Sequence, residues 1–128
     1  MAETGKRPEI LVGRARTWAA MGQHARATAE AQFHMESQQP TAKVFFLAAC
    51  VYGKSAEAVR DAVELPEAER KRLSEEYATR AVSCLARAEQ GDFFAAKNTV
   101  KFLKSEPDFA GLRSRTDFQK LAGQVKGE

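Results

Sequence analysis

Residue types that commonly carry out chemistry are thinly spread along this chain of 128 residues. His24 and His34 are ten positions apart, and no third ligand stands at a spacing typical of a metal site. Cys50 and Cys84 form no Cys-x-x-Cys pair, and neither they nor any serine lies in a nucleophile motif. Carboxylates are plentiful, but solvated helix faces explain them. We therefore expect no catalytic residue, no metal and no cofactor, and a protein that is not an enzyme.

One basic cluster has a spacing that could bind a ligand. Lys97, Lys101 and Lys104 stand four and three positions apart, so they would share one face of a helix. Phe94 and Phe102 are close to them in sequence. Such a face could receive an acidic peptide or a phosphate backbone. The more common outcome for a run of charges is a solvated face, here over a short capping helix.

The composition limits the class of protein further. A chain that is 44% apolar and 29% charged is typical of a soluble globular domain. The net charge of +3 is too small to indicate nucleic-acid binding, which usually shows a clustered basic stripe. No apolar signal segment and no membrane-length apolar run occurs, and the two cysteines are interpreted as reduced core residues. We therefore expect a cytoplasmic protein that does not contact a membrane, with nucleic acid disfavoured as a partner.

The stretch around which the chain is organised is residues 41–53, which is apolar on every side apart from Lys43. A helix of this composition has no solvated face, so neighbouring elements must cover it. Gly53 is expected to end this central helix. A separate short amphipathic helix is then predicted over residues 56–63, with Val63 facing inward.

Helical spacing of apolar residues extends over most of the remaining chain, and no alternating strand pattern competes with it. Gly22 is expected to end the first helix as a C-terminal glycine. Residues 1–7 are predicted to be a flexible tail. The predicted fold is all-α, a single domain over residues 8–125 with three parts: a hairpin over 8–36, an extended hairpin over 41–90 and short helices over 93–125.

The first hairpin resembles one tetratricopeptide repeat (TPR), a pair of antiparallel helices. Its large, small, aromatic, turn-glycine and small positions are held by Leu11, Ala15, Trp18, Gly22 and Ala27. The second hairpin matches at seven further positions, which are Phe45, Ala48, Ala49, Tyr52, Ala81, Leu85 and Ala88. Between the two halves of this second match lies an insertion, residues 54–76, that we interpret as an extension of the hairpin. The resemblance implies a right-handed superhelix closed by short C-terminal capping helices.

The last part of the chain is similar to the closing segment of the TPR tails of certain large bacterial Ser/Thr protein kinases. Leu112, Arg113 and Phe118 match the run Leu-Arg-x-x-x-x-Phe of that family. The chain has no Gly-rich phosphate loop, no His-Arg-Asp loop and no Asp-Phe-Gly motif. The resemblance therefore implies a non-catalytic regulatory tail or a freestanding relative of such a kinase.

In the TPR family the first helices of the hairpins line a concave groove that holds a peptide of a partner. The matching positions here are Arg16, Ala20, Lys43, Phe46, Cys50 and Lys54. Phe46 beside two lysines suits a peptide that has an apolar anchor and a carboxylate. The resemblance thus implies a protein-protein interaction or scaffold module with a protein or peptide partner. A homodimer through the helix of Leu11 and Trp18 is compatible with this role. Two other classes are the alternatives: a helical domain that binds nucleic acid or an acidic ligand on the lysine face, and a small-molecule sensor or enzyme with a pocket between its helices, whose residues the sequence does not identify.

Overall fold

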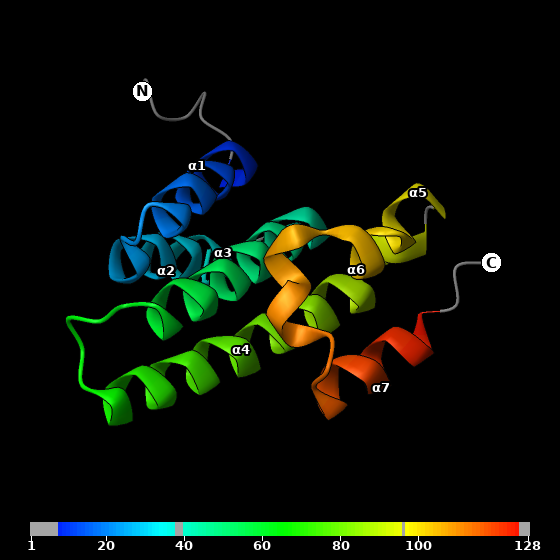
Figure 1. Ribbon diagram of the computed structural model, residues 1–128. Coiled ribbons are helices and arrows are strands. Elements are labelled where there is room, and N and C mark those ends of the chain that lie inside the picture. The colour runs from blue at the N-terminus through cyan, green and yellow to red at the C-terminus, as the bar shows by residue number, and fades with distance from the viewer. Residues whose placement is uncertain (1–7, 38–39, 96, 126–128) are drawn as a thin grey trace, which may run out of the picture.

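A computed structural model describes residues 8–37, 40–95 and 97–125 (Figure 1). Every element in these ranges is helical, so the predicted all-α class is confirmed. Seven are α-helices and two, named η2 and η3, are 3-10 helices: α1 (Pro8–Ala20), α2 (His24–Met35), α3 (Ala42–Arg60), α4 (Glu67–Gln90), η2 (Phe93–Ala95), α5 (Lys97–Val100), α6 (Phe102–Ser105), η3 (Pro107–Leu112) and α7 (Thr116–Gln124). The tail predicted over residues 1–7 lies outside the described residues. In the described ranges no helix is both long and apolar enough to cross a membrane.

The first hairpin is closed by a glycine, as predicted. Gly22 has a φ of +85°, in the left-handed region that favours glycine. The N–H of Gly22 donates to the carbonyl of Ala19 at 3.0 Å, and that of Gln23 donates to the carbonyl of Trp18 at 2.9 Å. This pair of hydrogen bonds is the Schellman arrangement, which satisfies the last carbonyls of α1 and turns the chain back into α2.

The apolar stretch forms the centre of the fold. α3 packs against α1, α2, α4 and η3, and it lies between the first hairpin and α4 in Figure 1. Every residue from Val44 to Gly53 is buried, which confirms that neighbours cover all sides of this helix. Thr41 caps its start, because its hydroxyl oxygen accepts the N–H of Val44 at 3.1 Å.

The predicted end of the central helix is wrong. α3 continues through Gly53 to Arg60, and no separate helix forms over residues 56–63. Gly53 is needed for a different reason, because a Cβ at this position would collide with the carbonyl oxygen of Asp108 in η3. Val63 does not face inward: it lies in the loop after α3 and is 84% exposed.

α3 and α4 form a long hairpin, the longest pair of helices in the fold. α3 and α4 are antiparallel, and residues 61–66 connect them (Figure 1). Both helices are longer than the helices of an ordinary repeat. The inward stripe of α4 is buried where expected, at Tyr77, Ala81, Leu85 and Ala88. The insertion between the two halves of the second repeat match therefore lengthens both helices.

The C-terminal segment folds back over α3 as a series of short helices. Phe46 of α3 lies at the centre of an aromatic cluster that this segment supplies: its ring centroid is 4.5 Å from Phe93, 5.4 Å from Phe102 and 5.8 Å from Phe109. One straight helix could not direct all of these rings at a single residue. The chain therefore bends repeatedly between η2 and η3.

Candidate protein-interaction site

Three of the six predicted groove residues do come together. Arg16, Ala20 and Lys54 line a shallow hollow of about 390 Å³ between α1 and α3, which Asp108 of η3 borders. Lys43 does not line this hollow and is exposed in the first turn of α3. The structure therefore places part of the predicted groove residues on one surface.

Phe46 and Cys50 are not accessible to a partner, which corrects the predicted groove. Phe46 is only 5% exposed, and Cys50 is fully buried. The reason is that η2, α6 and η3 cover the face of α3 on which these two residues lie. An apolar side chain of a partner was expected to pack on Phe46. The ring of Phe109, from the chain itself, packs there instead.

The cations of the hollow are also neutralised internally. Nη2 of Arg16 lies 3.0 Å from Oε2 of Glu106 and 2.9 Å from Oδ2 of Asp108. Nζ of Lys54 lies 3.1 Å from Oε1 of Glu57 and 3.8 Å from Oδ1 of Asp108. Because these carboxylates already hold the two cations, the hollow has little remaining attraction for an acidic peptide.

The same cluster contains three groups that could ligate a metal ion. One ligand atom each from Cys50, Glu106 and Asp108 lies within 4.8 Å of the others. Arg16, however, already donates to both carboxylates. Burial raises the pKa of the Cys50 thiol, so it stays protonated and a poor ligand. We interpret this cluster as an ion-pair network that fastens η3 to α1.

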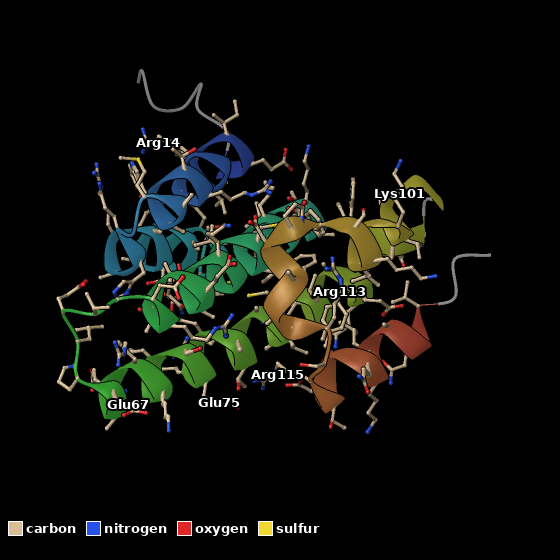
Figure 2. The ribbon with its side chains drawn as sticks, viewed as in Figure 1. Arg14, Glu67, Glu75, Lys101, Arg113 and Arg115 are labelled. Atoms are coloured by element: carbon tan, nitrogen blue, oxygen red, sulfur yellow. The ribbon has the colours of Figure 1, made fainter. Side chains whose placement is uncertain are left out.

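A second hollow lies between α6 and α7. α6 packs against α5 and η3, whereas α7 packs against α4, and the two helices leave an open groove of about 330 Å³ (Figure 1). Arg115 fixes the start of α7 on α4, since its Nη1 lies 2.9 Å from Oε1 of Glu75 (Figure 2). Most of the groove lining is apolar and comes from Val100, Leu103, Phe118, Ala122 and Val125.

Lys104 and Arg113 add positive charge to this groove. The Nε of Arg113 donates to the carbonyl of Leu103 at 2.9 Å and its Nη2 to the carbonyl of Glu106 at 2.7 Å, so both acceptors are neutral. Among the described residues neither Lys104 nor Arg113 forms an ion pair. The nearby carboxylates of Glu106 and Asp117 are instead held by Arg16 and Arg115.

The predicted lysine face is only partly retained. Lys97, Lys101 and Lys104 do not lie on one helix, because α5 ends at Val100 and α6 begins at Phe102. Lys101 is exposed on the outer side of these helices, away from α7 (Figure 2). The side chain of Lys97 lies outside the described residues.

Arg113 and the α7 residues of the groove were not predicted as site residues. A usable signal was present, because Phe118, Ala122 and Val125 stand four and three positions apart and form an apolar stripe. Such a stripe usually marks the face of a helix that packs into the core. It does pack inward, but its edge also lines the groove.

The end of the first hairpin carries cations. The guanidinium carbons of Arg14 and Arg26 lie 4.7 Å and 3.8 Å from the ring centroid of Trp18. A symmetric dimer through Trp18 would bring these like charges together. The homodimer through this helix stays a prediction.

Comparison with known proteins identifies no relative: no family model, curated protein or solved structure matches this chain. The resemblance to tetratricopeptide repeats thus rests on motif positions and helical hairpins.

Proposed function

We propose that this chain is a non-catalytic protein-interaction module, and that the groove between α6 and α7 receives an acidic amphipathic segment of a partner protein. The observation that carries the proposal is an open apolar groove whose cationic side chains have no carboxylate partner among the described residues. An apolar side chain of the partner would pack on the partly exposed Val100 and Ala122, and its carboxylates would pair with Lys104 and Arg113.

The charge around the groove favours an acidic partner. Lys104 and Arg113 line the groove, whereas the acidic residues of this segment, Glu106, Asp108 and Asp117, do not. All three carboxylates are engaged by Arg16 or Arg115. The positive charge left over would speed association with an acidic segment and orient it.

The apolar residues that line the groove favour a peptide over a nucleic acid as the partner. A phosphate backbone is recognised by cations and gains nothing from a floor of leucine, valine and phenylalanine. A partner helix with one apolar face uses both features. We therefore place the peptide first and keep the nucleic-acid interpretation as the alternative.

The finer parts of the proposal rest on the resemblance. We propose that the two hairpins adopt the right-handed arrangement of tetratricopeptide repeats, in a cytoplasmic scaffold that is the regulatory tail or a freestanding relative of a bacterial Ser/Thr kinase. The order of the motif positions and the packing of both α1 and α2 on α3 support this.

The test is selection from a display library of random 16-residue peptides against the purified chain, followed by fluorescence anisotropy with the enriched peptides. We expect acidic amphipathic sequences, and a loss of affinity of about tenfold or more in Lys104→Glu. Lys71→Glu is the matched control, because it makes the same charge change at an exposed lysine near the start of α4 that does not line the groove.

Neutral or basic peptides, or equal affinity for both variants, would contradict the proposal. Preferential binding of a random single-stranded oligonucleotide, weakening steeply with salt, would support the alternative instead.

A further inference from the structure

A separate hollow lies where α2, α3 and α4 meet, and the proposed peptide groove does not use it. Its volume is about 210 Å³, below the range of pockets for drug-sized ligands, so it would hold one small molecule. Its lining combines charged, polar and apolar side chains: Gln32, Met35, Glu36, Phe45, Tyr52, Arg80, Ser83, Cys84 and Arg87.

Arg87 is the cation of this hollow that is free to bind. Its guanidinium carbon lies 4.4 Å from the centroid of the Phe45 ring, so the group is stacked on an aromatic face. Stacking holds the guanidinium and leaves its N–H edge open to a carboxylate. Arg87 has no ion pair within the described ranges, whereas Arg80 is near Glu76, with 3.6 Å between Nε and Oε2.

Glu36 supplies the opposite charge. Its Oε2 accepts a hydrogen bond from Nε2 of Gln32 at 2.5 Å. The amide of Gln32 is itself oriented, because its Oε1 accepts the hydroxyl of Tyr52 at 3.1 Å. Among the described residues Glu36 also lacks an ion pair, and it does not approach Arg87 within ion-pair distance. One hollow thus presents an unpaired cation and an unpaired anion.

The remaining wall is apolar and polarisable. Sγ of Cys84 lies 3.4 Å from Sδ of Met35, and the Phe45 ring lies beneath Arg87. Thioether, thiol and aromatic groups adapt well to an apolar side chain. The hollow therefore offers three kinds of contact to one small ligand.

We propose that this hollow binds a free amino acid with an apolar side chain. The α-carboxylate pairs with Arg87, the α-ammonium pairs with Glu36, and the side chain packs on Met35, the partly exposed apolar residue of the lining. A zwitterion matches both unpaired charges, whereas a simple anion such as phosphate leaves Glu36 opposed to it.

The test is titration of the full chain with L-leucine, L-methionine and L-phenylalanine, followed by calorimetry and by amide NMR shifts. For the best of the three we expect saturable binding with shifts in α2, α3 and α4. Two analogues of leucine dissect the charges: 4-methylpentanoate lacks the ammonium, and 3-methylbutylamine lacks the carboxylate. Each should bind about tenfold or more weakly than leucine.

Variants test the two charged residues. Arg87→Gln and Glu36→Gln should each weaken amino-acid binding by about tenfold or more. Arg72→Gln and Glu67→Gln, at exposed positions outside the hollow, should leave it unchanged. No saturable binding of any of the twenty L-amino acids, equal binding of 4-methylpentanoate, or tighter binding of inorganic phosphate would overturn the proposal.

Discussion

The hollow between α1 and α3 and the groove between α6 and α7 place similar residue types together, but the chain treats them differently. In the first, the cations Arg16 and Lys54 are paired with Asp108, and Phe46, the apolar residue expected beside them, does not line the hollow because it is buried under the C-terminal segment. In the second, Lys104 and Arg113 have no ion pair among the described residues, and Val100 and Ala122 of the lining are partly exposed. Cations near apolar side chains indicate a binding surface only where other residues of the same chain neither pair with the cations nor bury the apolar groups.

The largest expected effect comes from removing Phe109, which packs against Phe46 in the core. Phe109 is fully buried, so Phe109→Ala should lower the free energy of unfolding by about 3 to 5 kcal/mol, measured by urea denaturation. Phe33→Ala is the control, because Phe33 is 69% exposed and its removal should cost much less. Equal losses in the two variants would mean that η3 is not part of the core.

A smaller effect is expected from the ion pairs that hold η3. Arg16→Ala leaves the carboxylates of Glu106 and Asp108 without their main partner in a half-buried site. Because Arg16 is one-third exposed, solvent reduces the penalty below that of a fully buried pair, to about 2 kcal/mol. Arg72→Ala removes an exposed arginine that also has two carboxylate partners, and it should change stability far less. Indistinguishable unfolding curves would refute the fastening role of Arg16.

The pH dependence should have opposite signs at two aspartates. Burial raises the pKa of Asp108 despite Arg16, so its contribution to stability is present at low pH and is lost as the pH rises through its folded pKa. Hydrogen bonding from Arg115 lowers the pKa of Asp117, so its contribution is present at neutral pH and is lost as the pH falls.

Unfolding between pH 3 and 7 checks this. Relative to wild type, Asp117→Asn should be less stable at pH 7 and should converge with it in acid. Asp108→Asn should instead become less stable relative to wild type as the pH falls toward the ordinary aspartate pKa of 3.8. Slopes of the same sign would show that Asp108 is not held in a desolvated site.

The smallest expected effect concerns the open groove. Lys104→Glu should change the free energy of unfolding by no more than about 0.5 kcal/mol, because an exposed, unpaired lysine contributes little to stability. The same variant should nevertheless lose affinity for an acidic peptide. A large destabilisation would indicate that Lys104 is structural.

The parts of the fold that depend on local signals could be predicted from the sequence. Gly22 closes the first hairpin through its own backbone, and the stripe of α4 follows from helical spacing. Gly53 was misinterpreted because its role depends on Asp108, which is distant in sequence. A glycine that ends a helix and one that admits another backbone look alike in a single sequence.

The site was harder to predict for the same reason. Arg16 and Lys54 were correctly placed on one surface, yet no local pattern shows that Glu106 and Asp108 would neutralise them. The groove between α6 and α7 arises because the two helices pack on different neighbours. Tertiary packing of this kind leaves no signature in residue spacing.

The most direct test of the comparison is to map amide NMR shifts of the full chain on addition of an acidic amphipathic peptide from the selection. If the partner binds in the groove between α6 and α7, we expect shifts at Leu103, Phe118 and Ala122 and none at Arg16 and Ala20. Shifts confined to Arg16 and Ala20 would show that the partner binds in the hollow between α1 and α3 and would contradict the account.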